Sequence, residues 1–518
     1  MSRFEGEWIR RTTRGRWLRP PGATTSFSDF TIDSRCVAPD SVFVAIRGET
    51  HDGHDFVAQA AAVGARLLIV SREVDLAVLD PATAVLHVDD TVQALQQLGA
   101  AHRRRLSGLT VIAITGSAGK TTTRRILDAV LSTTLCGAQS PKSFNNHLGV
   151  PLTLLSARSE HRYLLVEIGM NAPGEIKALT ALAAPEIGIV TGIGRAHLEG
   201  VGSIDGVARE KTELLRSLAP QGLAVANVDQ PAILAHLHGI SGLRTLVTYG
   251  LAPTAQHRLT GRAPGTAAGA STPGVQTENR ATHETGVAVG QEFTLDGTFS
   301  AWLGLPGEHN AVNALAAVIV ARHLGLDDRA IRVGLAAVAP SEMRLEPSSI
   351  STGDQAEPIL LFNDAYNANP ESVVASLSTF AEIAPPPADS RRIIILGDML
   401  ELGAHGASLH REVGERLAAM AAKLVGRPGD RIVCVGPLMQ QAAAAFEAQP
   451  STGHVKVELI SSLGATELAR LIESFAPGDV ILLKGSRGMA LERIATELRR
   501  RFGPPIAGSR EGQQCSTT

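Results

Sequence analysis

TGSAGKTTT, residues Thr115–Thr123, lies between an apolar run, Leu109–Ile114, and a segment with helical spacing, Arg124–Thr133. A glycine-rich loop between a strand and a helix directs backbone N–H groups and the helix N-terminus at one point, where a phosphate group fits. In such a loop Lys120 reaches the β- and γ-phosphates of a nucleotide, and Thr121 or Thr122 holds Mg²⁺. The stretch therefore predicts an α/β nucleotide-binding domain. The alternative, a glycine-rich turn in an ordinary α/β domain, stays open on this stretch alone.

The composition limits the class of protein. With 518 residues, the chain is long enough for roughly two to four domains. A net charge of −3 gives no reason to expect a nucleic acid partner. The four cysteines are scattered without metal-ligand spacing, which is typical of a reducing compartment. No apolar run reaches the roughly 18 residues that cross a bilayer, and the basic N-terminus lacks the apolar segment of a signal peptide. We expect a cytoplasmic protein with no membrane insertion.

Short apolar runs and polar turns divide the chain into domains. We expect a basic, poorly ordered extension at residues 1–28, a small α/β domain at 29–105, a central domain at 106–340, a C-terminal domain at 341–502 and a disordered tail at 503–518. In the C-terminal domain strand-like runs alternate with helical segments, which implies a parallel sheet wrapped by helices. Residues 263–285 are rich in Ala, Gly, Thr and Pro. Such a composition does not bury enough apolar surface to order itself, so we expect a flexible surface insertion there.

Polar residues directly follow several of the apolar runs. Glu167 and Thr191 do so in the central domain, and Asp364, Asp398 and Lys484 do so in the C-terminal domain. Open parallel sheets bind ligands at the carboxyl ends of their strands, so we expect these residues to line two facing crevices, one on each large domain. For any single residue the simpler interpretation, a polar residue that ends a strand, stays open.

Glu167 and His197 are candidate Mg²⁺ ligands. Mg²⁺ prefers oxygen, and one or two carboxylates with phosphate oxygens and water complete its coordination. A single histidine is more often a surface or core residue than a ligand. Lys211 lies on a helical stretch, Asp205–Leu218, and taken alone is most simply a solvated lysine. The residues by themselves leave these alternatives open.

Between residues 30 and 502 the chain resembles the Mur ligases. The stretches that carry the resemblance are, in chain order, TIDSRCVAPDSVFVAIRGETHDGHDFV, TGSAGKTTT, SFNNHLGVPLTLL, EIGMNAPGEI, GIGRAHLEGVGS, AREKTEL, GEHNAVNALAA, RLE, NDAYNANPESVVASL, LGDMLELG and KGSRGM. Each is a modest signal alone, but their order and spacing are specific. Within the family, YNANPES and LGDMLELG point to the member that adds D-alanyl-D-alanine to the UDP-N-acetylmuramoyl-tripeptide of peptidoglycan.

The resemblance implies an α/β fold of three domains: a UDP-substrate-binding domain at 29–105, a central P-loop-type ATPase domain with a parallel sheet, and a Rossmann-like C-terminal domain. It also implies an ATP-dependent amide ligase that works through an acyl phosphate. ATP and Mg²⁺ would be its cofactors, and UDP-N-acetylmuramoyl-tripeptide and D-alanyl-D-alanine its substrates. We expect a monomer.

The resemblance also implies a role for individual residues. The catalytic residues would be Lys120, His197 and a carbamylated Lys211. The ATP-binding residues would be Gly116, Ser117, Ala118, Gly119, Lys120, Thr121, Thr122, Asn310, Asn313, Arg344 and Asp364. The Mg²⁺ ligands would be Thr121, Glu167, His197 and Lys211. The substrate-binding residues would be Ser34, Arg35, His51, Asp52, Gly53, His54, Asn145, Asn146, Tyr366, Asn367 and Asn369.

The chain departs from the family pattern at a few positions, of which Asn363, where an acid is common, weakens any expectation of a paired acid beside Asp364. Lys484 and Arg487 either bind carboxylates of the substrate or cap the sheet. Two other functions stay open. One is a sister ligase that adds the third amino acid, although no Asp-Asn-Pro-Arg stretch is present. The other is a non-catalytic nucleotide-binding relative, which the retained Lys120 and Lys211 argue against.

Overall fold

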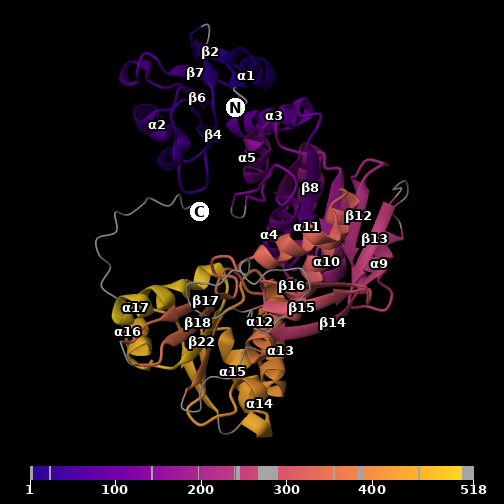
Figure 1. Ribbon diagram of the computed structural model, residues 1–518. Helices are drawn as coiled ribbons and strands as arrows, with labels where there is room; N and C mark the ends of the chain where they lie inside the picture. The colour runs from indigo at the N-terminus through magenta and orange to yellow at the C-terminus, as the bar shows by residue number, and fades with distance from the viewer. Residues whose placement is uncertain are drawn as a thin grey trace.

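The computed structural model describes residues 4–22, 25–141, 144–196, 198–238, 240, 245–265, 290–353, 356–382, 390–452 and 455–503. Three α/β units follow one another along the chain, each built around its own sheet, and the central unit lies between the other two (Figure 1). In these ranges no helix combines the length and the hydrophobicity that crossing a bilayer requires.

The N-terminal unit has a five-stranded sheet in the order β2-β7-β6-β5-β4. Its strands are β2 (Arg16–Arg19), β4 (Phe30–Thr31), β5 (Val42–Val44), β6 (Leu67–Val70) and β7 (Ala84–His87), and its helices are α1 (Gly6–Thr13), α2 (Val57–Val63) and α3 (Thr91–Arg105). The core of this unit also includes Leu152 and Leu155 from α5 (Gly149–Ser156), so apolar contacts join it to the central unit.

The expectation of a poorly ordered extension at residues 1–28 is wrong for residues 4–22 and 25–28. Strand β2 pairs antiparallel with β7, and β1 (Phe4–Glu5) pairs with β3 (Ser26–Phe27). Phe4, Ile9 and Phe27 are buried in the core of the N-terminal unit. The arginines made this segment resemble a basic extension, although apolar residues between and beside them are buried.

The central unit has a nine-stranded sheet in the order β16-β15-β14-β13-β12-β11-β8-β10-β9. Its strands are β8 (Thr110–Thr115), β9 (Gly137–Gln139), β10 (Tyr163–Glu167), β11 (Ile187–Val190), β12 (Leu223–Asn227), β13 (Thr245–Gly250), β14 (His257–Gly265), β15 (Gly290–Leu295) and β16 (Phe299–Leu303). The strands from β9 to β14 are parallel, as expected, whereas β14, β15 and β16 pair antiparallel at one edge. Residues 263–265 belong to β14 and not to an insertion, and residues 266–289 lie outside the described part of the chain.

Helices cover both faces of the central sheet. They are α4 (Lys120–Leu131), α5, α6 (Glu175–Ala183), α7 (Leu198–Val201), α8 (Ile204–Arg216), α9 (Ala232–Leu237), α10 (Glu308–His323) and α11 (Asp328–Ala337). Val111 and Ala113 of β8 share a core with α5, α6 and α8, while Ile112 and Ile114 share a second core with α4, α10 and α11. Because both faces of the strand are buried, its sequence is a continuous apolar run.

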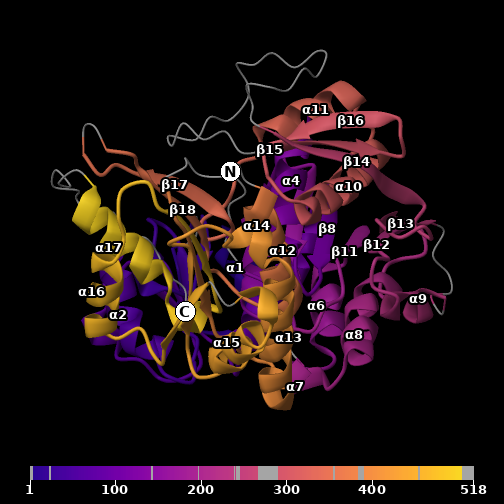
Figure 2. The same ribbon diagram turned by 90° about the horizontal axis from the view of Figure 1, so that it is seen from below.

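The C-terminal unit has a six-stranded sheet in the order β17-β18-β22-β19-β20-β21, parallel except for β17. Its strands are β17 (Glu346–Ile350), β18 (Ile359–Asp364), β19 (Arg392–Gly397), β20 (Arg431–Val435), β21 (Lys456–Ile460) and β22 (Val480–Lys484). Its helices are α12 (Pro370–Glu382), α13 (Gly406–Ala419), α14 (Ala421–Leu424), α15 (Met439–Glu447), α16 (Ala465–Glu473) and α17 (Glu492–Phe502). Helices α12, α13 and α15 cover the face toward the central unit, as Figure 2 shows for α12 and α13, and α16 and α17 cover the other face.

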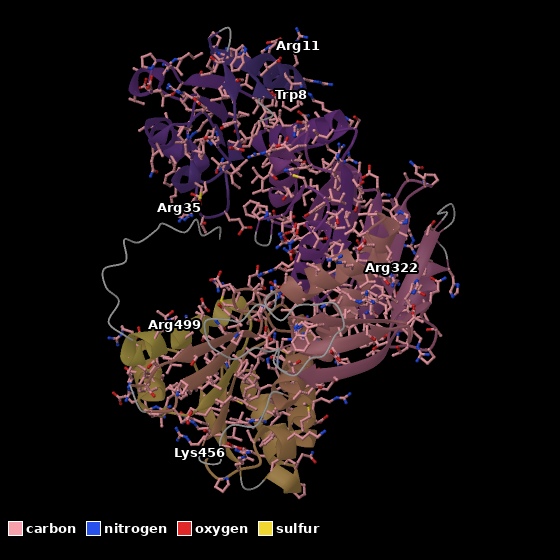
Figure 3. The ribbon with its side chains drawn as sticks, viewed as in Figure 1. Trp8, Arg11, Arg35, Arg322, Lys456 and Arg499 are labelled. Atoms are coloured by element: carbon pink, nitrogen blue, oxygen red, sulfur yellow. The ribbon has the colours of Figure 1, made fainter. Side chains whose placement is uncertain are left out.

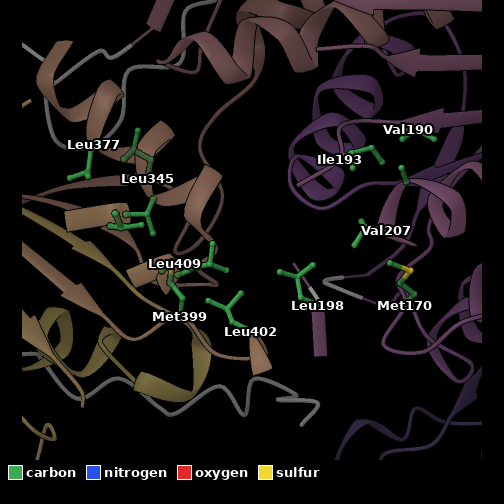
Figure 4. Packing of buried hydrophobic residues seen from close by; sticks show 14 of the residues in the cluster. Met170, Val190, Ile193, Leu198, Val207, Leu345, Leu377, Met399, Leu402 and Leu409 are labelled. Carbon is green, nitrogen blue, oxygen red and sulfur yellow. The ribbon is translucent and has the colours of Figure 1, made fainter. Parts of the chain in front are cut away.

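One apolar cluster runs from the central unit into the C-terminal unit. Leu198 of α7 points toward Leu402, which follows β19 (Figure 4). A Cβ atom on Gly403 would lie 3.3 Å from the Cβ of Glu199, so the two segments pack closely. The two large units therefore meet through buried side chains as well as across the cleft described next.

Candidate active site

The phosphate-binding loop turns at two glycines that a side chain would block. Gly116 and Gly119 have φ angles of 154° and 85°. A Cβ atom would lie 2.0 Å from Thr191 Oγ1 at Gly116 and 2.6 Å from Asn313 Oδ1 at Gly119. The backbone N–H of Ser117 donates to Gly192 O at 2.9 Å. The loop is thus held by the segment after β11 and by α10.

Lys120 begins α4 directly after this loop. Its Nζ donates to Gly116 O at 2.5 Å, across the mouth of the loop. Burial lowers the pKa of Lys120, and the nearby Glu167 carboxylate opposes that shift. A phosphate group in the loop would supply this ammonium with an anionic partner.

Glu167 stands at the end of β10, beside the start of α4. Its Oε1 accepts a hydrogen bond from Arg124 Nε at 2.6 Å, and its Oε2 accepts one from Thr121 Oγ1 at 3.2 Å. Glu167 is almost fully buried. Within the described ranges no group of three or more His, Cys, Asp or Glu side chains could hold a metal ion. One carboxylate and one hydroxyl nevertheless fit Mg²⁺, which takes its other ligands from phosphate and water.

Lys211 of α8 is completely buried, so its interpretation as a solvated lysine is wrong. Its Nζ has no hydrogen-bond partner among the residues that the structure describes. Burial and the charge of Lys120 lower the pKa of Lys211 well below its usual value. His197 lies outside the described residues, so its place relative to Lys211 stays a prediction.

Two asparagines of α10 form another wall of the site. Asn310 and Asn313 are both buried, with Asn313 against Gly119 of the loop. Asn310 Nδ2 donates to Pro306 O at 2.6 Å. Burial lowers the pKa of His309, which directly precedes Asn310 on α10, to about 4, so this imidazole is neutral at pH 7.

The C-terminal unit supplies the opposite wall. Arg344 Nη2 donates to Thr121 Oγ1 at 2.9 Å, and its guanidinium lies over the Tyr366 ring at 4.1 Å. Asp364 forms an ion pair with Lys484 at 2.8 Å, and Lys484 also donates to the backbone oxygen of Asn367 at 3.0 Å. The Arg344 guanidinium of the C-terminal unit thus reaches α4, the helix that begins at the phosphate-binding loop.

Arg195 makes a second connection between the two large units. Its Nε donates to Glu371 Oε1 at 2.8 Å, and its Nη2 donates to Glu412 Oε1 at 2.9 Å. These hydrogen bonds, led by the one to Glu412, raise the pKa of Arg195, and Arg195 in turn lowers the pKa of Glu412. The amide of Asn369, at the start of α12, donates to Ser117 O at 3.5 Å.

These residues line one cleft of about 1640 Å³ between the central and the C-terminal unit. The two expected crevices are therefore two walls of a single cleft. The predicted residues that line it are Ser117, Ala118, Gly119, Lys120, Thr121, Thr122, Asn145, Asn146, Glu167, Thr191, Asn310, Asn313, Arg344, Asp364, Tyr366, Asn367, Asn369 and Lys484. Gly116 and Lys211 lie behind this lining.

Some predicted residues lie elsewhere. Asp398 does not face the cleft, because its carboxylate accepts the backbone N–H groups of Leu438 and Met439 at the start of α15. Arg487 is also outside the lining and pairs with Glu492 at 3.3 Å.

The residues expected to bind the UDP end lie in the N-terminal unit and do not line the cleft; Figure 3 labels Arg35 there. They are Ser34, Arg35, His51, Asp52, Gly53 and His54. Asp52 Oδ1 accepts from His54 Nδ1 at 2.6 Å, and His54 Nε2 accepts the Ser71 N–H at 2.9 Å. These two bonds fix the orientation of the imidazole.

Arg124, Arg195 and His309 belong to the site or its support but were not predicted from the sequence. Arg124 is buried on the inward face of α4, four residues after Lys120. A charged residue on an otherwise apolar helix face is the sequence pattern that could have indicated its role. Arg195 and His309 both lie inside stretches quoted for the resemblance, GIGRAHLEGVGS and GEHNAVNALAA. In these stretches the neighbouring His197 and Asn310 were assigned to the site instead.

Family models cover most of the chain. The models described as Mur ligase family, catalytic domain; Mur ligase middle domain; and Mur ligase, glutamate ligase domain match residues 27–103, 114–321 and 344–487. Among solved structures, crystal structure I of MurF from Acinetobacter baumannii has a TM-score of 0.78 and 28% identity, and the match covers 96% of this chain and 99% of that one. A MurF ligase from Thermotoga maritima in complex with ADP has a TM-score of 0.67 at 24% identity, covers 92% and 97% of the two chains, and supports the fold.

Curated relatives match over nearly the whole length. Two carry the name UDP-N-acetylmuramoyl-tripeptide–D-alanyl-D-alanine ligase. The protein from Escherichia coli (strain K12) is 34% identical over 92% of this chain and 95% of its own length. The protein from Bacillus subtilis (strain 168) is 31% identical over 95% of this chain and 97% of its own length. With its fold, its phosphate-binding loop and these matches, the chain belongs to the Mur ligase family.

Proposed function

We propose that this chain is the ATP-dependent ligase that joins D-alanyl-D-alanine to UDP-N-acetylmuramoyl-tripeptide, which completes the pentapeptide precursor of peptidoglycan. The observation that carries the proposal is the cleft, where Lys120 of one unit and Arg344 of the other converge on the phosphate-binding loop. The choice of substrates is supported by the names of the relatives that match nearly the whole chain.

The reaction couples amide formation to ATP cleavage. The terminal carboxylate of the tripeptide attacks the γ-phosphorus, ADP leaves, and an acyl phosphate forms. The free amine of D-alanyl-D-alanine then attacks the acyl carbon, the C–O bond to phosphate breaks, and the amine loses a proton as inorganic phosphate leaves. Lys120 and Arg344 are placed to stabilise negative charge that develops on the transferred group. Closure of the two large units excludes water, which would hydrolyse the acyl phosphate.

Two Mg²⁺ ions would supply charge compensation for the phosphates. Thr121 and Glu167 would hold the first ion, because their oxygens already lie together beside Lys120. His197 and Lys211 would hold the second. The buried, unpaired Nζ of Lys211 supports carbamylation: its lowered pKa keeps the amine neutral, and a neutral amine adds CO₂, loses a proton and becomes an anionic oxygen ligand.

The remaining predicted residues are assigned to the substrates. Asn310 and Asn313 would bind adenine, and Asp364 would help Arg344 to close over the nucleotide. Asn145 and Asn146 on one wall of the cleft, and Tyr366, Asn367 and Asn369 on the other, would bind the tripeptide and the dipeptide. In the N-terminal unit Ser34, Arg35, His51, Asp52, Gly53 and His54 would bind the UDP end. We infer a cytoplasmic monomer, since ATP and a nucleotide-linked substrate are cytoplasmic and one chain supplies both walls of the cleft.

Product analysis tests the proposal. The chain is incubated with UDP-N-acetylmuramoyl-tripeptide, ATP, Mg²⁺ and either D-alanyl-D-alanine or single amino acids, and products are identified by mass spectrometry. We expect the tripeptide to gain the mass of the dipeptide less one water. A parallel reaction contains the UDP-dipeptide in place of the tripeptide, and a product there with a single added amino acid would assign the chain to the sister ligases. ATP binding without any ligation would indicate a non-catalytic relative.

A further inference from the structure

Arg195 makes four hydrogen bonds across the contact between the two large units, and Arg262 makes two more there, to Glu382. Arg195 lies in the segment after β11, in the central unit, and both carboxylates that it binds belong to the C-terminal unit. Glu371 is the second residue of α12 and Glu412 lies on α13. Its Nε and backbone N–H donate to Glu371 at 2.8 and 3.2 Å, and Nη1 and Nη2 donate to Glu412 at 2.5 and 2.9 Å. A planar guanidinium can hold two carboxylates in this way, whereas an ammonium cannot.

The same segment holds the phosphate-binding loop from behind. Ser117 N donates to Gly192 O at 2.9 Å. The side chain of Ser117 donates to Gly194 O at 3.0 Å and accepts the Gly194 N–H at 2.9 Å. These are three hydrogen bonds between Ser117 and two of the three residues that precede Arg195. A shift of this segment therefore moves the loop.

Gly194 is enclosed between the two units. A Cβ atom there would lie 3.1 Å from Glu371 Oε2 and 3.4 Å from the Cβ of Ser117. The amide of Asn369, which also accepts the Ser372 N–H at the start of α12, reaches Ser117 O at 3.5 Å. The start of α12, the segment at Gly194 and the phosphate-binding loop thus form one continuous network.

We propose that Arg195 is a positioning residue that couples docking of the C-terminal unit to the geometry of the phosphate-binding loop. It clamps Glu371 and Glu412 on one side, and its own segment holds Ser117 on the other. Arg195 lines the cleft, but in this role it acts through Ser117 and needs no contact with nucleotide or substrate. The inference rests on the proposed function only for the expected change in kcat. The expected change in amide exchange is measured without substrates and does not depend on that function.

Hydrogen–deuterium exchange tests the structural consequence in the full chain without substrates. Arg195→Gln removes the charge and the fork but keeps a side chain of similar length. We expect the Ser117 and Gly194 amides to exchange about fivefold faster, which is the size of effect that a partly exposed ion pair produces. The matched control is Arg391→Gln, which removes a two-bond pair with Asp479 inside the C-terminal unit. Unchanged exchange in Arg195→Gln, or equal acceleration in both variants, would overturn the proposal.

Kinetics test the functional consequence. If the clamp populates the docked state, Arg195→Gln should lower kcat about fivefold while KM for ATP changes less, because no residue assigned to ATP binding is replaced. Added salt should lower kcat of the wild type more than that of the variant, since it screens the same ion pairs. Arg195→Lys should recover only part of kcat. A loss confined to KM, or full activity of Arg195→Gln, contradicts the proposal.

Exchanging the charges of Arg195 and Glu412 distinguishes the loss of their ion pair from a general loss of folding. Arg195→Glu alone should be slower than Arg195→Gln, because it places an anion beside Glu371 and Glu412. Adding Glu412→Arg should restore part of both kcat and amide protection. Absence of rescue, in a double variant that melts at the wild-type temperature, would refute the pairing. If neither the wild type nor any variant ligates the dipeptide, the proposed function is wrong. The hydrogen–deuterium exchange result would still decide the role of Arg195.

Discussion

Two lysines are buried on the two large units, and their surroundings differ. Lys484, at the end of β22 in the C-terminal wall, lies 2.8 Å from Asp364 and 3.0 Å from the backbone oxygen of Asn367. Lys211, on α8 of the central unit, is completely buried and its Nζ has no hydrogen-bond partner among the described residues. A buried cation without a partner is strongly unfavourable, so it loses its proton instead. Lys484 thus has an ion-pair and a hydrogen-bond partner within the fold, whereas Lys211 has none among the described residues.

The largest expected effect is on catalysis through Lys211. Lys211→Met keeps the length of the side chain and removes the amine. Since a ligand position for Mg²⁺ would be lost, we expect kcat to fall on the order of 100-fold or more. The melting temperature should not fall, because an unpaired polar group is replaced by an apolar one. Turnover and thermal unfolding of the same preparation check both statements. A variant with normal turnover would remove Lys211 from the site.

Lys484→Met should instead act on stability. It leaves the Asp364 carboxylate without its cation in a largely buried position, which costs about 3 kcal/mol. Denaturant unfolding measures the change, and Asp364→Asn in the same background should recover part of the loss. A stable Lys484→Met variant would show that this pair is not a structural one and would favour a direct role with the substrate.

The pH dependence of stability should report on the protonation of Lys211 in the folded protein. The folded pKa of Lys211 is lowered, so below its unfolded pKa of about 10.4 the unfolded chain binds the additional proton. The free energy of unfolding therefore rises with pH, by at most about 1.4 kcal/mol per pH unit, until that value is reached. In CO₂-free buffer, the advantage of Lys211→Met over the wild type should shrink between neutral pH and pH ~10. A difference that stays constant over this range would mean that Lys211 is protonated in the folded protein.

The smallest effect is expected away from both lysines. Gly265 of β14 and Gly290 of β15 are paired neighbours in the sheet, so a short turn can join them. Replacing residues 266–289 with such a turn should change stability by roughly 1–2 kcal/mol at most, because closure free energy varies by about 0.6 kcal/mol per doubling of loop length. Turnover should stay unchanged. A large fall in the melting temperature would show that this segment packs against the body.

The local parts of the fold could be predicted from the sequence. Continuous apolar runs located β8, β10, β11, β18, β19, β20 and β22, because strands buried on both faces need them. The loop at Thr115–Thr123 and the position of Glu167 at the end of β10 follow from the same local rules. The antiparallel β15 and β16 were not foreseen, since nothing local in a strand states the direction of its partner.

The rest of the site depends on contacts between distant segments. Arg195 and Glu412 are 217 residues apart, and Arg344 and Thr121 are 223 apart, so no local pattern pairs them. Lys211 is different, because a signal was present. It stands four residues after Val207 and four before Leu215, on the buried face of α8, where a solvated lysine does not belong.

The most direct test of the account follows the oxygen atoms. UDP-N-acetylmuramoyl-tripeptide labelled with ¹⁸O in its terminal carboxylate is ligated to D-alanyl-D-alanine with unlabelled ATP, and the inorganic phosphate is analysed by mass spectrometry. An acyl phosphate requires that one carboxylate oxygen leaves with the phosphate, so we predict one ¹⁸O atom in each phosphate released. Ligation that yields unlabelled phosphate would contradict the proposed reaction.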